Sequence, residues 1–500
     1  MMSPFSWLRN LSNPLTHQAG FGPVLRIIAV LLLVLVVMMA LPLAVLALER
    51  DPDIRAFATS ILITLGVSGL LLVLTRDAGF ELRPRQMFIL TVMSWVVFAG
   101  FASLPMMLGS PQLSIADAVF EAVSGVTSTG ATVIVDLDTT SDGIKLWRGL
   151  LQWIGGVGII VMAIAILPFL KVGGMRLFQT ESSAWTEHIV PRAGGMAKSI
   201  SMVYLGLSAL AMLSYWLLGM RPFDAVVHGM TSVSTGGFAN YDESFGVYAS
   251  RPAILWVTVL FMLSGALPFV LYVRFITQRS MAIWRDQQVR GFFTILLVVI
   301  AMMTLERMLH HPGPFWPALT EITFNVVSVI TTTGYATSDY NHWGTFAVSV
   351  FFYLLFIGGC SGSTTGGMKV FRFQVGLVML VNQLRHLVHA QGVFVQRYNG
   401  RPLTDDIVRA VVAFSSFFFF TVSALSVALS FLGLDMVTSL SASVSMLGNT
   451  GPGLGELIGP AGNYAGMPEA AKWLLSFAML LGRLEILTVL VLLTPAFWRK

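Results

Sequence analysis

The residues with the clearest chemical potential are four Thr-Gly pairs, each of which follows an acidic residue and a short apolar stretch. Carbonyl oxygens at such corners can replace the hydration shell of a monovalent cation. Glycine suits this role because it adopts backbone conformations with positive φ and lets carbonyl groups crowd together. We therefore expect the pairs to bind a cation. The pairs are Thr129-Gly130, Thr235-Gly236, Thr333-Gly334 and Thr450-Gly451, and the acids before them are Asp117, Asp224, Glu321 and Asp435.

The four pairs occupy the same place in a repeated pattern. The glycines lie 13, 12, 13 and 16 residues after their acids, and successive glycines are 106, 98 and 117 residues apart. A single Thr-Gly pair would indicate an ordinary extracellular turn, since glycine is common in loops. Only five such pairs occur in the chain, however, and four share this pattern. It favours four pore loops that converge on one axis, with the short helices pointing their partially negative C-terminal ends at its centre.

The segments that must position these loops are long and apolar. Hydrophobic residues make up 55% of the 500-residue chain and charged residues 11%, with a mean hydropathy of +0.78. A soluble domain carries about 25% charged residues, and about 20 apolar residues cross a bilayer as a helix. Ten membrane spans are predicted. Eight carry no charge: Ile27–Leu48, Ala56–Thr75, Gln86–Ala116, Gly149–Leu170, Ile200–Met220, Pro252–Val273, Asn341–Met368 and Ala410–Leu434; the others are Gly291–Leu305 and a last helix from Pro468 to Phe497, interrupted at Arg483 and Glu485.

The distribution of charge predicts the orientation. With both termini inside, 21 lysines and arginines lie in inner segments and 8 in outer ones, as the positive-inside rule requires. The acids run the other way, with 17 of 25 outside. An acidic outer vestibule concentrates cations. Because the arginines are scattered between spans rather than clustered with exposed aromatic residues, binding of nucleic acid is not expected.

Five stretches together resemble the Trk/Ktr/HKT superfamily of potassium transporters, most closely the Trk-H-type potassium uptake subunit of bacteria. They cover all four repeats, from about Gln86 to the C-terminus, and the two N-terminal spans are similar to the additional pair of the Trk-H branch. The stretches are SGVTSTGATVI (124–134), TSVSTGGF (231–238), SVITTTGYATSDY (328–340), GGCSGSTTGGMKVFR (358–372) and SMLGNTGPGLG (445–455).

The resemblance implies an all-α integral membrane protein in which four membrane–pore-loop–membrane repeats surround a pseudo-fourfold pore. It also implies a homodimer and a cytosolic nucleotide-binding regulatory subunit. Potassium-selective members carry glycine at the first filter position of every loop, which favours potassium over sodium here. We divide the chain into the N-terminal helix pair (1–85) and pore repeats 1 (86–198), 2 (199–287), 3 (288–404) and 4 (405–500).

Two further features bear on gating. Gly358, Gly359, Gly362, Gly366 and Gly367 lie within eleven residues, which fits equally an unwound intramembrane segment and an ordinary cytoplasmic turn. The resemblance implies a loop at 358–368 that obstructs the pore below the filter. Arg483 lies within the last span, where an ionisable side chain is costly. It could form a structural salt bridge to another helix, whereas the resemblance implies that it faces the pore as a barrier to cations.

The sequence therefore predicts potassium uptake across the bacterial inner membrane by a multi-pass protein with both termini in the cytoplasm. Potassium is the substrate at the eight Thr-Gly residues, and neither a cofactor nor enzymatic activity is expected. No Walker sequence or dinucleotide-binding unit occurs. Channel-like flow is favoured because no chain of buried carboxylates is evident. Secondary transport coupled to protons or sodium is the alternative, and a non-conducting scaffold or enzyme is a further one.

Overall fold

The structure is a computed structural model that describes residues 20–165, 193–310 and 313–499. The predicted all-α membrane fold is confirmed: apart from a two-stranded hairpin of β1 (Arg397–Tyr398) and β2 (Arg401–Pro402), the described regular elements are helices. The last residues of the predicted span Gly149–Leu170 fall outside the described residues.

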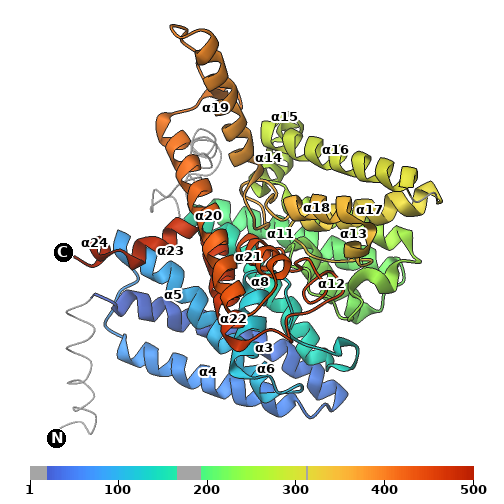
Figure 1. The fold of residues 1–500 in the computed structure, drawn as a ribbon. Coiled ribbons are helices and arrows are strands. Elements are labelled where there is room, and N and C mark those ends of the chain that lie inside the picture. Colours follow the sequence, from blue (N-terminus) through green and yellow to red (C-terminus); the bar gives the residue numbers. More distant parts are fainter. Residues whose placement is uncertain (1–19, 166–192, 311–312, 500) are drawn as a thin grey trace, which may run out of the picture.

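The N-terminal helices α3 (Gly22–Glu49) and α4 (Ile54–Leu74) form a packed pair along one side of the molecule (Figure 1). Their long runs of leucine, valine and isoleucine favour helices that cross an apolar layer. Ser68 on α4 donates a hydrogen bond to the carbonyl of Ala29 on α3 (2.8 Å), which ties the two helices together. The predicted N-terminal pair is thus present. It is followed by α5 (Pro84–Ala102) and the short α6 (Leu104–Leu108).

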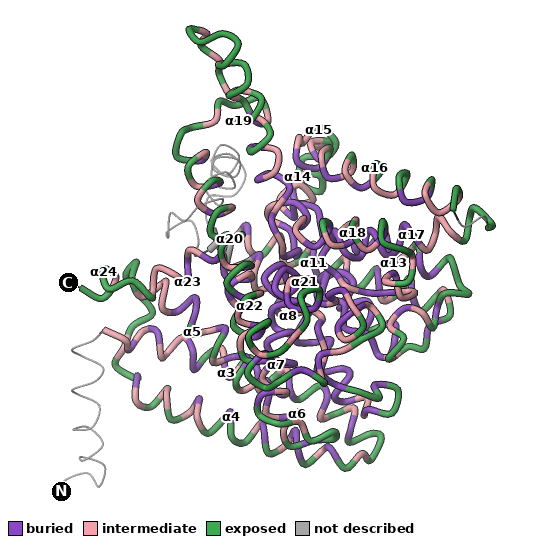
Figure 2. Tube along the Cα trace, in the orientation of Figure 1, coloured by how far each residue is buried: buried purple, intermediate pink, exposed green. Residues whose placement is uncertain are grey.

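Four short helices lead into the four Thr-Gly loops and lie at the buried centre of the molecule (Figure 2). Two start with side-chain caps: Ser114 accepts from the amide of Asp117, and Asp435 accepts from that of Thr438. The prediction that an acid opens each helix is wrong for the third, because Glu321 lies beyond its first turn. These pore helices are α7 (Ile115–Val126), α12 (Pro222–Val233), α17 (Phe315–Ile330) and α21 (Met436–Gly448).

The remaining helices surround the pore helices. Helix α19 extends beyond the main body (Figure 1). Three short 3-10 helices lie in the connections: η1 (Leu137–Thr139), η2 (Ser244–Tyr248) and η3 (Tyr340–Trp343). The α-helices are α8 (Asp142–Ala165), α11 (Ala193–Leu217), α13 (Pro252–Ala266), α14 (Phe269–Gln278), α15 (Ala282–Arg285), α16 (Gln287–His310), α18 (Thr345–Leu354), α19 (Val370–Val388), α20 (Asp405–Phe431), α22 (Glu469–Arg483), α23 (Ile486–Leu493) and α24 (Pro495–Trp498).

Two predicted spans are broken, the second of them at the predicted interruption by Arg483 and Glu485. Within the described residues, six helices are long and apolar enough to cross a membrane, or up to eight spans if each of two bent pairs counts as one. Helices α13 and α14 meet at 93°, and α22 and α23 meet at 112°. The first bend follows Leu267 and Pro268, where both residues are extended and proline donates no amide hydrogen bond. The second is at Glu485, whose φ is +61°.

The predicted single span Asn341–Met368 is also wrong. Helix α18 ends at Leu354, and non-helical backbone follows until α19 begins at Val370. Glycine-rich sequence from Gly358 onward disfavours a helix, because glycine loses the most backbone entropy there. The backbone of segment 358–368 is therefore not helical. An unwound intramembrane segment was one of the two predictions for it, and a cytoplasmic turn was the other.

Candidate functional site

The four loops after the pore helices have the same backbone geometry. In each, one amide donates to the carbonyl five residues earlier, at 2.8 to 2.9 Å. The residue before that donor has a positive φ of 49° to 53°, and the residue after it is a glycine with a φ of 81° to 104°. The donors and acceptors are Thr129 and Ser124, Gly236 and Thr231, Thr333 and Ser328, and Thr450 and Ser445.

This geometry shifts the register of the second loop by one residue. The glycine with positive φ there is Gly237, not the predicted Gly236, and Gly236 takes the place of the threonines of the other loops. Thr235 corresponds to the residue before each threonine. The shift also makes the acid-to-glycine spacing equal in the first three loops. Gly237 lies 13 residues after Asp224, and Gly130 and Gly334 lie 13 residues after Asp117 and Glu321. The run Thr-Gly-Gly allowed either register; tertiary packing selects the second.

The loops meet in a closed ring. A Cβ atom built on each positive-φ glycine would lie 2.6 Å or less from a carbonyl oxygen of the next loop, which explains why no side chain is present there. The order is cyclic: Gly130 faces the carbonyl of Gly236, Gly237 that of Thr333, Gly334 that of Thr450, and Gly451 that of Thr129. We call the eight residues Thr129-Gly130, Gly236-Gly237, Thr333-Gly334 and Thr450-Gly451 the filter ring.

A second layer of polar side chains supports the ring. In each repeat, a side chain on the pore helix accepts a hydrogen bond from the amide three residues after the filter glycine. The acceptors differ in residue type, so the sequence analysis did not identify them. The one feature that could have marked them is a polar residue nine or ten positions before each glycine. The pairs are Glu121 and Val133 (2.8 Å), His228 and Asn240 (3.4 Å), Asn325 and Thr337 (3.2 Å), and Ser441 and Leu454 (2.9 Å).

Two side chains of α8 strengthen the junction of the first two loops. Arg148 forms a fully buried ion pair with Glu121 (2.8 Å) and donates to the carbonyl of Ala239 (3.0 Å). Gln152 donates to the carbonyl of Gly236 (2.5 Å) and accepts from the amide of Phe238 (3.0 Å). Buried polar groups must be paired in this way to avoid a large desolvation cost. The bonds therefore hold the second loop in its register.

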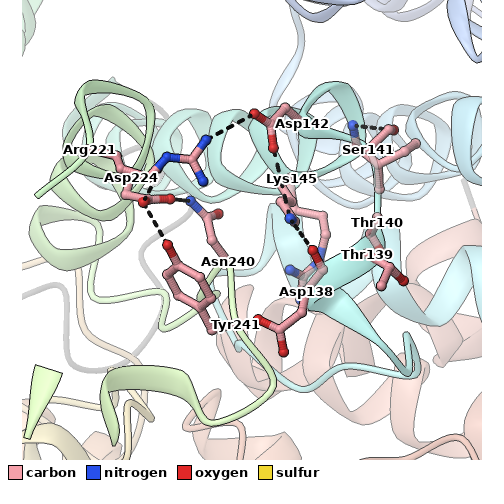
Figure 3. A network of polar contacts seen from close by, with 12 residues as sticks. Asp138, Thr139, Thr140, Ser141, Asp142, Lys145, Arg221, Asp224, Asn240 and Tyr241 are labelled. Carbon is pink, nitrogen blue, oxygen red and sulfur yellow. Dashed lines mark hydrogen bonds and ion pairs between the residues drawn. The ribbon is translucent and has the colours of Figure 1, made fainter. Parts of the chain in front are cut away.

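On one side of the ring, the four glycines Gly130, Gly237, Gly334 and Gly451 line a small cavity of about 70 Å³. Beside it, a polar network joins the first two repeats (Figure 3). Asp224 accepts from Asn240 (2.8 Å) and Tyr241 (2.7 Å), and Arg221 lies 4.0 Å from Asp224 and 3.9 Å from Asp142. Tyr241 lines the cavity and thereby connects the network of carboxylates and a guanidinium to it.

The predicted acids have structural partners. Asp117 forms an ion pair with Lys472 (2.5 Å) on α22, and Glu321 accepts from Ser338 (2.6 Å). Asp435 caps its helix. Each acid is therefore held near the start of a pore helix or beside the loop that follows it.

On the opposite side of the ring, the glycine-rich segment 358–368 lies directly against the filter loops. Thr235 donates to the hydroxyl of Thr364 (3.1 Å), and the amide of Gly366 donates to the hydroxyl of Thr332 (2.8 Å). A Cβ on Gly366 would lie 2.8 Å from the Cβ of Asn449, so the backbone packs tightly on the fourth loop. The segment thus contacts the residue before the filter pair in three loops.

Arg483 completes the layer that the glycine-rich segment forms against the ring. It is buried, and it donates to the carbonyl of Thr364 (2.8 Å), the carbonyl of Gly155 (3.1 Å) and the hydroxyl of Ser128 (3.3 Å). No ion pair among the described residues includes Arg483, which counts against the alternative of a structural salt bridge. Glu485 instead pairs with Arg372 on α19 (2.7 Å). Arg483 and the glycine-rich segment together contact all four loops from this side of the ring.

Comparisons with known proteins agree with this geometry. Residues 53–500 match the family model described as TrkH, cation transport protein. The Trk system potassium uptake protein TrkI of Halomonas elongata is 59% identical over 96% of this chain and 97% of its own length. TrkH of Escherichia coli is 35% identical over 96% of this chain and 100% of its own. The crystal structure of the potassium transporter TrkH from Vibrio parahaemolyticus superimposes with a TM-score of 0.88 at 35% identity, covering 96% of this chain and 100% of that one.

Proposed function

This chain belongs to the TrkH family of cation transport proteins, and from that premise we propose that it takes up potassium through the filter ring. The observation that carries the proposal is the cyclic order of the four loops, in which each glycine faces a carbonyl of the next loop. Four such carbonyls around one centre can replace the hydration shell of potassium. The C-terminal ends of four pore helices point at the same centre and favour a cation there.

Growth of potassium-uptake-deficient cells at low potassium tests the function directly. Cells that express this chain should grow, and purified protein in liposomes should take up rubidium, a potassium tracer, in preference to sodium. Failure in both assays with well-expressed, monodisperse protein would contradict the proposal and revive a non-conducting role.

The glycine-rich segment and Arg483 serve as the gate in this proposal. Non-helical backbone at membrane depth is tolerated only where it is buried in protein or lines a wet cavity, and this segment lies against three filter loops. The guanidinium of Arg483 adds a positive charge beside the remaining, first loop, where it donates to Ser128, and this charge repels a descending cation. Conduction then requires the segment to move away from Thr235, Thr332 and Asn449.

Channel-like conduction is favoured over coupling to protons. Among the described residues, the buried carboxylates are Asp53, Glu121 and Asp224, and each accepts hydrogen bonds from neighbouring groups. A proton relay across the membrane needs a chain of titratable groups. Reversal potentials measured in liposomes should therefore follow the potassium gradient alone, and a dependence on the pH or sodium gradient would favour the secondary transporter.

We further propose that the protein lies in the inner membrane as a homodimer and binds a cytosolic regulatory subunit. Helix α19, which extends beyond the body, supports the assembly: apolar side chains at helical spacing are between 39% and 75% exposed along it (Figure 1). Such a stripe is typical of a helix that packs against a partner. These residues are Leu377, Leu380, Val381, Leu384, Leu387 and Val388. Cross-linking through cysteines placed on the stripe should yield a covalent dimer; monomers alone would contradict the assignment.

A further inference from the structure

A second cavity, of about 770 Å³, lies on the side of the ring that carries the glycine-rich segment. Its walls come from α14, α15, the start of α16, and the hairpin of β1 and β2. Cavities of about 300 to 1,000 Å³ are typical of sites for small molecules. Four arginines line it: Arg274, Arg285, Arg290 and Arg401.

Basic residues outnumber acidic ones in the lining of this cavity. Asp286 is the one acidic residue among those that line it. Both of its carboxylate oxygens already accept hydrogen bonds, one from the amide of Val289 (3.0 Å) and one from the side chain of Asn399 (3.0 Å). Arginine is well suited to a phosphate group because its planar guanidinium can donate two parallel hydrogen bonds. The cavity therefore fits an anion that carries phosphate.

The cavity is also partly apolar. Val270, Leu271 and Met281 line it beside the arginines. On the same helices, Ile276 and Trp284 are 65% and 63% exposed, as expected where a protein meets lipid. Basic cavities between membrane helices on the inner side commonly hold phospholipid headgroups. A ligand with a phosphate group and an apolar part matches both the arginines and the apolar residues of the lining.

The walls are bonded to the glycine-rich segment at two points. Ser361, which itself lines the cavity, donates from its amide to the side chain of Gln288 (2.5 Å). The amide of Phe269, at the start of α14, donates to the carbonyl of Gly362 (3.0 Å). A ligand that changes the spacing of α14 and α16 thus acts on both anchors of the segment.

We propose that this cavity binds the phosphate of an anionic ligand, namely a phospholipid headgroup. Binding of this ligand then controls the position of the glycine-rich segment. The second half rests on the gating role proposed above; the binding half does not. The matched control is Arg397, an exposed arginine on the same hairpin that does not line the cavity.

The binding test uses purified full-length protein and a fluorescent phosphatidylglycerol in neutral detergent micelles, with inorganic phosphate as the soluble probe. The double variant Arg274→Gln/Arg401→Gln should bind the lipid at least about tenfold more weakly, which corresponds to about 1.4 kcal/mol, whereas Arg397→Gln should bind like wild type. Binding of inorganic phosphate that the double variant loses, without lipid binding, would assign the site to a soluble phosphate. Equal binding by wild type and the double variant for both probes would overturn the site.

The gating test compares rubidium uptake in liposomes of phosphatidylcholine alone and with added phosphatidylglycerol. Wild type and Arg397→Gln should respond to the anionic lipid, and Arg274→Gln/Arg401→Gln should not. If the double variant loses binding but responds like wild type, the coupling to the segment is refuted while the site stands. Absence of uptake by wild type in every liposome would instead contradict the transport function, and the binding result would remain independent of it.

Discussion

The sharpest prediction concerns the register of the second loop, and it compares Gly237→Ser with Gly236→Ser. At Gly237, φ is +81°, and a Cβ would press against the carbonyl of Thr333. An L-residue in this conformation costs about 1–2 kcal/mol, and the overlap adds strain that only movement of the ring relieves. We therefore expect Gly237→Ser to disturb the carbonyl ring itself and to lower the rubidium-to-sodium uptake ratio about tenfold, a loss of about 1.4 kcal/mol.

At Gly236 the effect should be different in kind. A Cβ there would lie 2.4 Å from the side-chain amide of Gln152, which can rotate away, and 2.9 Å from the Cβ of Gln152, which requires a small shift of the backbone; φ is not positive. Rotation of Gln152 breaks its hydrogen bonds to Gly236 and Phe238, which costs about 1 kcal/mol each. Gly236→Ser should therefore lower the free energy of unfolding by about 2 kcal/mol and change the uptake ratio much less than Gly237→Ser.

The assay measures uptake of labelled rubidium and sodium by matched liposomes, together with thermal unfolding of each purified variant. Gly130→Ser is the reference, because Gly130 occupies the same position in the first loop and should relax rejection of sodium in the same way. If Gly236→Ser reproduces the loss of selectivity seen with Gly130→Ser while Gly237→Ser retains wild-type selectivity, the register argued here is refuted.

Three other changes test the layer formed by Arg483 and the glycine-rich segment, and the support of the ring. Arg483→Ala should raise rubidium uptake because a positive charge leaves the path under the filter; lower stability without faster uptake would favour a structural role. Deletion of Ser361–Thr365 should also raise uptake, and a well-expressed variant with unchanged or lower uptake counts against the gate. Glu121→Ala should destabilise the protein by about 3–5 kcal/mol by leaving Arg148 buried without its partner, as measured by chemical denaturation, and Glu121→Ala/Arg148→Met should recover part of that loss.

Much of the architecture was predictable because its signals are local. Runs without charge predicted the N-terminal helices and most of the other long apolar helices, since hydropathy adds along the chain. The acid-to-glycine spacing predicted the pore helices and their loops. The motifs around Gly130 and Gly451 also identified the family, which the comparisons confirm.

Other features depend on which distant segments meet. The sharp bend after Ala266 and the end of α18 at Leu354 were not visible in hydropathy, because apolar residues continue through both points. The charges of Arg483 and Glu485 marked the interruption of the last span, but not the sharpness of its bend. The supporting residues Glu121 and His228 share a position but no chemistry, so no motif marks them.

The sequence alone thus determined the order of the helices and the four glycine-bearing corners. Each of these features depends on residues that lie within one or two helical turns of each other in the chain. The choice between Gly236 and Gly237 was decided by the tertiary structure. Both are glycines in one run, and only contacts with Gln152 and Thr333, which lie far away in the chain, distinguish them. A ring closed by segments about a hundred residues apart selects its register through sterics and hydrogen bonds across the ring, and these exist only after the chain has folded.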